Sequence, residues 1–222
     1  MDDSNWERYG LAAGIVFVVL VVIAALIGGS PPKPSDSAAK VFSFFRDNQD
    51  ALKVGSYLNG VGAVAFLWFL GSLWARMRRA EGTGSRVSVI ALIGGLGGLG
   101  LAFVANAVTA YLALYVGRLG PSSQGLYLLS VVFLAFTSFF LAVFTSATSV
   151  TILRYGFVER WMGWAGEVIA ALWLVAGIGV SDDNTTIFTV GFIAFLLWAI
   201  WLLVLSVLLL TRDAPAAASS RR

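Results

Sequence analysis

The sequence predicts an all-α integral membrane protein: a bundle of six transmembrane helices, with one amphipathic helix outside the membrane between the first and second spans. Three observations support this fold class. Hydrophobic residues make up 59% of the 222 residues, and the mean hydropathy is +0.85. Charged residues make up only 12%, against about 25% in soluble domains. Six apolar segments are long enough to cross a bilayer core, which takes about 20 helical residues.

The six predicted spans form a single domain over residues 1–212. They cover residues 10–29, 56–74, 87–116, 126–153, 164–180 and 187–210. The first span contains no charge, and the residues before it are net acidic. We therefore expect it to be kept as a helix rather than cleaved as a signal peptide. The tail 213–222, rich in alanine and serine, is predicted to be a disordered cytoplasmic segment.

The long first loop is predicted to contain the amphipathic helix, over residues 36–53. Three prolines at 31, 32 and 34 break the chain before it, and Ser35 or Asp36 offers an N-cap. Apolar residues then recur at helical spacing, and charged residues occupy much of the remaining surface. The simplest interpretation is a lid packed on the outer ends of the spans. The alternative is a docking surface for a partner or a gate over a cavity.

The orientation follows from the distribution of basic residues among the short loops, because cytoplasmic loops carry an excess of Lys and Arg. Basic residues gather after the second span, after the fourth span and in the tail: Arg76, Arg78, Arg79, Arg86, Arg154, Arg160, Arg212, Arg221 and Arg222. Between the third and fourth spans there is only Arg118. We therefore predict a multi-pass protein of the plasma (inner) membrane with both termini in the cytoplasm.

Several kinds of chemistry are excluded by composition. The chain has no cysteine and no histidine, which excludes disulfides, thiolate zinc sites and haem held by His or Cys. Intramembrane hydrolysis or acyl transfer needs a nucleophile paired with a base, or paired acids with a metal. The spans offer neither arrangement, so we predict no enzyme activity, no catalytic residue, no metal, no cofactor and no nucleic-acid partner.

One acidic residue, Glu167, lies inside an apolar span, and ionisable residues at such depth are costly and often functional. Hydroxyls of the fourth span, Thr145, Thr148 and Ser149, are expected at a similar depth. Together with Asn106 on the third span, these residues form the candidate polar cavity. The alternative is that Glu167 reaches the membrane surface or pairs with a nearby arginine, and that the hydroxyls only bond to their own helix.

The third span contains closely spaced glycines, of which Gly94 and Gly98 have the GxxxG spacing that lets helices approach closely. We interpret them as a packing face. This face, or the outer helix at residues 36–53, could also bind a protein partner or a second copy of the chain. Asn106, further along the same span, is expected to hydrogen-bond to a neighbouring helix, with Asn59 as a possible partner.

Residues 34–79 carry a resemblance to a known type of protein. A short outer helix leads into a second span that contains Phe66 to Leu70 and then Leu73 to Arg76. This stretch resembles uncharacterised six-helix integral membrane proteins of actinobacterial type, a family of unknown function. The resemblance implies the six-helix layout and no activity or site.

Two functions are consistent with these observations. The leading hypothesis is a non-enzymatic structural, accessory or sensor protein that acts through partner contacts in the bilayer. The alternative is a small channel or transporter for an ion or small solute, with an inner-leaflet polar cavity around Glu167 as its site.

Overall fold

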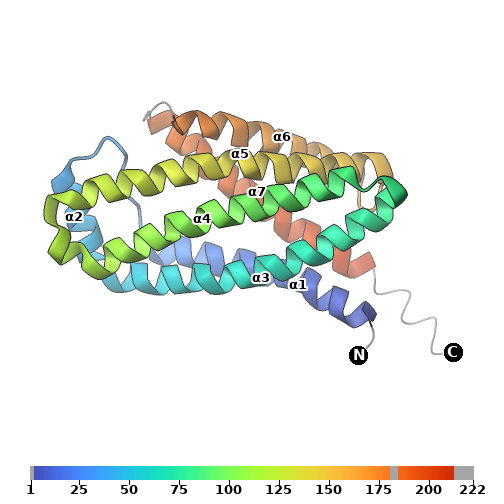
Figure 1. Ribbon diagram of the computed structural model, residues 1–222, viewed down its shortest axis with the longest axis horizontal. Helices are drawn as coiled ribbons and strands as arrows, with labels where there is room; N and C mark the ends of the chain where they lie inside the picture. Colours follow the sequence, from blue (N-terminus) through green and yellow to red (C-terminus); the bar gives the residue numbers. More distant parts are fainter. Residues whose placement is uncertain (1–2, 181–184, 213–222) are drawn as a thin grey trace.

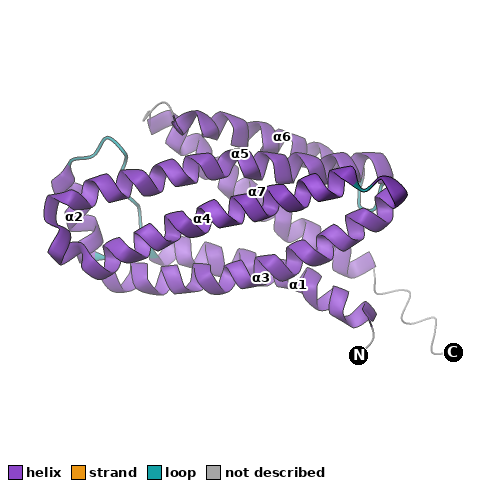
Figure 2. Cartoon of the chain, in the orientation of Figure 1, coloured by secondary structure: helices purple, strands orange, loops and turns teal. Residues whose placement is uncertain are grey.

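The computed structural model describes residues 3–180 and 185–212, and within these residues all regular secondary structure is helical (Figures 1 and 2). The predicted all-α class is confirmed at this level. Residues 213–222, predicted to be a disordered tail, lie outside the described residues. The α-helices are α1 (Asp3–Ile27), α2 (Ala38–Asp47), α3 (Gln49–Glu81), α4 (Arg86–Leu119), α5 (Ser123–Tyr155), α6 (Arg160–Ala176) and α7 (Thr185–Arg212).

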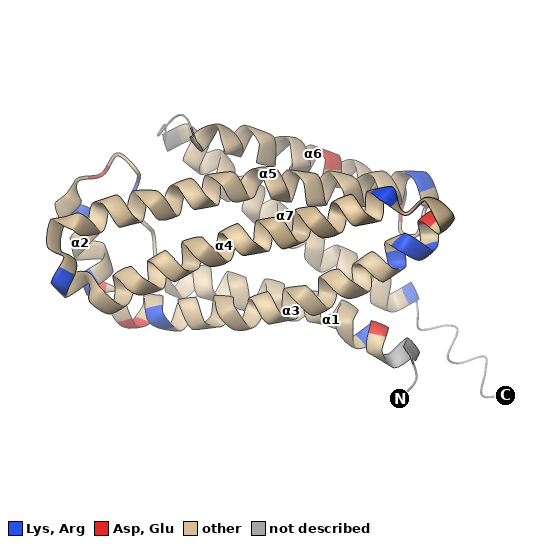
Figure 3. Cartoon of the chain, viewed as in Figure 1, with Lys and Arg blue, Asp and Glu red and all other residues tan. Residues whose placement is uncertain are grey.

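The long helices have the length and composition needed to cross a membrane. Five segments of the described chain meet both conditions, and one of them, Arg86–Tyr155, contains both α4 and α5 with a tight turn between them. Most of these helices extend beyond the apolar stretches predicted from sequence. Apart from Glu167 on α6, the charged residues lie mostly in these extensions and in the loops, and Figure 3 shows them gathered toward the two ends of the bundle. This distribution is typical of a bundle that spans a membrane.

The six long helices form a closed ring. Along the chain α1 packs against α3, α3 against α4, α4 against α5, α5 against α6 and α6 against α7, and α7 returns to α1. The start of α1 and the end of α7 lie at one end of this ring, and α2 lies at the other (Figure 1). We call these the termini end and the α2 end.

The structure corrects the boundaries of the predicted outer helix. The helix α2 covers Ala38–Asp47 rather than residues 36–53, and residues 49–53 already belong to α3. Asn48 separates the two helices: its backbone leaves the helical region (φ −110°, ψ 19°), and its side-chain amide donates to the carbonyl of Phe44 at 2.9 Å. The N-cap is Ser37, whose hydroxyl accepts from the backbone N–H of Lys40, rather than Ser35 or Asp36.

The helix α2 packs on the ends of α4 and α5. Its side chains Val41 and Phe45 are buried against residues of those helices, while Lys40 and Arg46 are exposed. The ring of Phe45 makes an edge contact with that of Tyr127 on α5, with centroids 5.8 Å apart. The segment therefore rests on the bundle as a lid.

We call the halves of the ring nearest these ends the termini half and the α2 half. In the termini half, close contacts between helices depend on glycine. A Cβ atom at Gly94 would lie 2.7 Å from the backbone nitrogen of Phe144, so α4 can approach α5 this closely only with glycine there. On α1, a Cβ at Gly10 or Gly14 would overlap the side-chain hydroxyls of Ser72 and Ser206 on the neighbouring helices. The Gly94/Gly98 face is thus used within the chain, covered by α5, and is not free for a partner.

Candidate binding cavity

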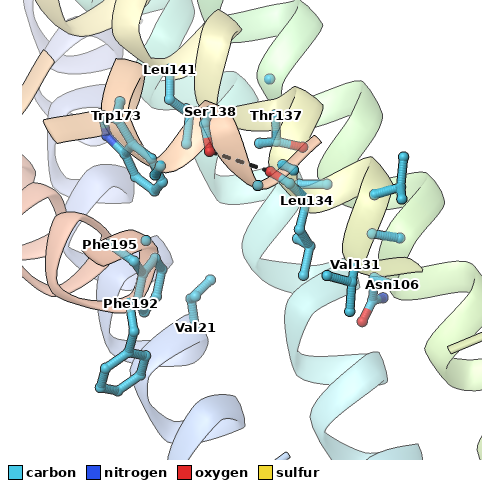
Figure 4. A pocket seen from close by; sticks show the side chains of 18 of the residues that line it. Val21, Asn106, Val131, Leu134, Thr137, Ser138, Leu141, Trp173, Phe192 and Phe195 are labelled. Carbon is cyan, nitrogen blue, oxygen red and sulfur yellow. Dashed lines mark hydrogen bonds between the residues drawn. The ribbon is translucent and has the colours of Figure 1, made fainter. Parts of the chain in front are cut away.

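A cavity of about 920 Å³ lies inside the ring, between its middle and the α2 end. All six long helices contribute side chains to its wall. Figure 4 shows Val131 and Leu134 of α5 on one side of this space and Phe192 and Phe195 of α7 on the other. Its volume is near the upper end of the range of about 300–1,000 Å³ typical of small-molecule sites.

Aromatic side chains form the floor of the cavity at the middle of the bundle. Phe66 lies at their centre, with its ring centroid 4.8 Å from that of Phe17, 5.9 Å from Phe144 and 6.1 Å from Trp198. All four side chains are at least 92% buried. Pairs at these separations pack well in tilted or edge-to-face arrangements, and here they separate the cavity from the termini half.

The loop between α1 and α2 crosses the α2 end of the cavity. Its residues Pro31 and Pro34 line the cavity wall. Two side chains of α5 hold the loop in place: the Tyr127 hydroxyl donates to the carbonyl of Pro32, and the Gln124 amide donates to the carbonyl of Asp36 at 3.0 Å. The loop therefore forms part of the cavity wall at this end.

The space inside the cavity leaves interior side chains exposed. Leu134 on α5 is 50% exposed, although it points into the ring (Figure 4). Two turns along the same helix, Leu141 at the floor is only 8% exposed. Such exposure of a leucine on an inward-facing helix surface marks a real gap in packing, since protein interiors are normally close-packed.

The part of the cavity wall that the structure describes carries no Lys, Arg, Asp or Glu. Its amide and hydroxyl side chains come from α3, α4 and α5: Asn59, Asn106, Thr109, Thr137 and Ser138. The three hydroxyls each donate to a carbonyl four residues earlier in their own helix, at 3.1, 2.9 and 3.4 Å respectively. The last of these bonds is drawn in Figure 4. Hydroxyls used in this way are common in membrane helices and offer no free donor.

The two asparagines form a pair across the α3–α4 contact. The Asn59 amide nitrogen donates to the Asn106 side-chain oxygen at 3.2 Å, and the Asn106 amide nitrogen donates to the carbonyl of Ser56 at 3.2 Å. The expected pairing of Asn106 with Asn59 is therefore confirmed. Both side chains are partly buried and line the cavity, so the pair is its main polar feature.

Glu167, the centre of the cavity predicted from sequence, does not line this space. The Ser146 hydroxyl lies 3.0 and 3.2 Å from the two carboxylate oxygens of Glu167 and donates to them from α5. Among the described residues no ion pair joins Glu167 to Arg154 or Arg160. Sequence reasoning missed Ser146. The α5–α6 hairpin placed residues 145–149 at the depth of Glu167, but the rotation of α5 decides which of them faces it.

The three predicted partners of Glu167 are packed between helices. Thr145, Thr148 and Ser149 are all fully buried. The Thr148 hydroxyl donates to a carbonyl of its own helix at 2.8 Å, and Ser149 packs against Gly166 of α6. The hydroxyl oxygens of Thr145 and Ser149 have no hydrogen-bond partner. Of the five predicted site residues, only Asn106 lines the large cavity.

The composition of the wall indicates what kind of molecule would fit the cavity. The described residues contain no group of three or more His, Cys, Asp or Glu side chains that could hold a metal ion. An apolar wall with a few placed polar groups is instead the usual form of a site for a small hydrophobic molecule.

Comparisons with known proteins found no match for this chain. No family model matches the chain, and neither a curated protein nor a solved structure matches it.

Proposed function

We propose that this chain is a six-span membrane protein that binds a hydrophobic ligand within the bilayer and acts as a non-enzymatic sensor or accessory protein. The observation that carries the proposal is the cavity of about 920 Å³ inside the ring, whose described wall residues are all uncharged. A void of this size costs packing energy in a membrane bundle, where van der Waals contact drives helix association. A ligand that fills it restores those contacts.

In this proposal α1, α3, α4, α5, α6 and α7 are the six spans and α2 lies outside the membrane. The charge-free part of α3, between Lys53 and Arg76, is about 34 Å long at 1.5 Å per residue. This length fits the hydrocarbon core of about 30 Å. The arginine-rich termini end is then cytoplasmic, and the cavity lies in the outer half of the membrane.

Binding is favoured over conduction by the floor of the cavity. A channel or transporter needs a path through the membrane, and the buried rings of Phe66, Phe144 and Trp198 fill the middle of the bundle. The alternative site at Glu167 is less well supported, because the three hydroxyls predicted to form a cavity with it, Thr145, Thr148 and Ser149, are packed between helices. Since α5 covers the Gly94/Gly98 face, a protein partner would contact the exposed side of α2.

A cavity-filling substitution tests the proposal. Ala102 lines the cavity, whereas Ala107 on the same helix is exposed on the outside of the bundle. We expect Ala102→Phe to fill the space and remove the bound hydrophobic molecule, and Ala107→Phe to leave binding intact. Native mass spectrometry of the protein released from detergent micelles counts the retained ligand. Equal retention by both variants, or no ligand on the unmodified chain, would contradict the proposal.

A further inference from the structure

The cavity has a shape and a chemistry that restrict its occupant. On the basis of the proposed function, we infer that the ligand is a neutral single-chain lipid, whose hydroxyl or carbonyl end lies against Asn59 and Asn106. Its hydrocarbon chain runs from this pair toward the aromatic floor. Length, charge and hydrogen bonding each support this assignment.

The length of the cavity matches one leaflet of a bilayer. Along α4 its wall extends from Gly98 to Thr109, and along α7 from Ile187 to Trp198. Each stretch rises about 16 Å at 1.5 Å per residue. Half of a hydrocarbon core of about 30 Å is about 15 Å, so a hydrocarbon chain that fits one leaflet also fits the cavity.

The absence of charge along the wall excludes an ionised group inside. Among the described residues of the wall, no Lys or Arg is present to pair with a phosphate or carboxylate, and no Asp or Glu to pair with an ammonium group. An unpaired charge in an apolar environment is far more costly than a neutral polar group that can hydrogen-bond. The part of the ligand that enters the cavity is therefore uncharged.

The asparagine pair supplies the hydrogen-bond donors. A side-chain amide has two N–H donors, and each amide of the pair uses its nitrogen in one bond within the protein, to Asn106 Oδ1 or to the carbonyl of Ser56. Each nitrogen thus keeps a second hydrogen. The cavity hydroxyls donate to their own helices. Trp173 and Trp198 also line the cavity and their indole N–H groups have no partner, but both nitrogen atoms are buried away from the space. The asparagine pair is therefore where a ligand oxygen finds accessible donors.

The position of the pair orients the ligand. Asn106 lies one turn from Thr109, at the α2 end of the α4 wall, while Phe66 and Trp198 lie at the opposite end of the cavity. A polar end near the pair lets the hydrocarbon chain contact the aliphatic wall and the aromatic floor. This arrangement repeats the polarity of the outer leaflet, where polar groups lie toward the surface.

Three ligands with the same chain test the assignment: hexadecane, hexadecanol and hexadecyl phosphate. Each is added to the purified full-length protein in detergent micelles, and bound copies are counted by native mass spectrometry. We expect hexadecanol to bind best, about threefold to tenfold above hexadecane, which corresponds to one neutral hydrogen bond. We expect hexadecyl phosphate to bind least. Preference for the phosphate, or equal binding of alcohol and alkane, overturns the assignment.

Substitutions of the pair locate the polar end. Asn59→Leu and Asn106→Leu should remove the preference for hexadecanol over hexadecane while hexadecane still binds. The control is Ser146→Ala, which removes another hydrogen bond within the bundle, at Glu167 and away from the cavity. Its preference should match that of the unmodified chain. A preference that survives in both asparagine variants overturns the placement at the pair.

Different results would contradict the proposed binding of a hydrophobic ligand and the assignment of that ligand as a neutral single-chain lipid. If no hydrocarbon ligand binds, or if Ala102→Phe leaves binding unchanged, the proposed function itself fails. If hexadecane binds and Ala102→Phe abolishes its binding, but hexadecanol gains nothing from Asn59 and Asn106, only the ligand assignment fails.

Discussion

The two halves of the bundle are built from the same helices yet differ in packing. In the termini half, glycines at 10, 14, 94, 163 and 166 bring neighbouring helices into direct contact. In the α2 half, the helices surround a cavity of about 920 Å³. Both halves are apolar. The difference shows that hydropathy places a helix in the membrane, whereas the size of the facing side chains decides how closely its neighbours approach.

The contrast has a physical cause in the membrane environment. Lipid chains are as apolar as a leucine side chain, so burial against another helix gains little hydrophobic free energy there. Stability then depends mainly on contact between well-fitted surfaces. A region can lose that contact and stay apolar, and this is what makes the α2 half suited to hold a ligand.

The largest expected effect separates two leucines of α5. Leu141 is 8% exposed and packs against Gly98, whereas Leu134 is 50% exposed in the cavity. We expect Leu141→Ala to cost about 2–5 kcal/mol, as for other well-packed leucines, and Leu134→Ala less than about 1 kcal/mol. Melting temperatures in mild detergent measure both. Equal losses would show that the cavity is as well packed as the floor.

A smaller effect is expected from two glycines of α4. A Cβ at Gly94 would lie 2.7 Å from a backbone atom of α5, whereas nothing lies within 4 Å of the same position at Gly100. We expect Gly94→Ala to destabilise the protein by about 1–3 kcal/mol, because a backbone atom cannot move aside. Gly100→Ala should be neutral or stabilising. A stable Gly94→Ala protein would mean that α4 and α5 are not held at this distance.

A third pair of variants compares hydrogen bonding near the boundary of the two halves. Trp201 and Trp198 are equally buried, but only the Trp201 indole N–H has a partner, the carbonyl of Met162 at 2.9 Å. Both Trp→Phe changes remove similar volume. We therefore expect Trp201→Phe to cost about 1 kcal/mol more than Trp198→Phe. If Trp198→Phe costs as much, its N–H has a partner in solution, such as water or a bound ligand.

The smallest effect is a dependence on pH at the termini end. The guanidinium of Arg212 hydrogen-bonds to the Glu159 carboxylate at 2.6 Å and lowers the pKa of Glu159 below its ordinary value. The stabilisation is therefore present above the pKa of the unfolded chain, about 4.3, and is lost as the pH falls through the lower pKa of the folded state. The melting temperature should fall more on acidification in the unmodified chain than in Glu159→Gln. Identical acid sensitivity would show that the pair contributes nothing.

Much of the fold could be predicted because each feature depends on local sequence. The spans follow from apolar length, and the break before α2 follows from the prolines at 31, 32 and 34. The end of α2 was misplaced, since Asn48 continues a helical pattern in sequence. Only its amide bond to Phe44 and the change of backbone angles show the break. The resemblance to actinobacterial six-helix proteins stays a prediction.

The candidate site was less predictable because it depends on helix rotation. Depth along a helix can be counted in residues, and Asn59 and Asn106 do meet as expected. Rotation about the helix axis is set by packing against several neighbours at once. For this reason Ser146 rather than Thr145, Thr148 or Ser149 binds Glu167.

By itself the sequence determined that this chain is helical and apolar, with charges confined mostly to the ends of long helices, and that Cys and His chemistry is excluded. Only the tertiary structure decided that the helices close into a ring, that glycine contacts fill one half, and that the other half is hollow. The physical reason is that span and composition are properties of single helices. A cavity is a property of six helices together, and it exists only where none of them fills the space between them.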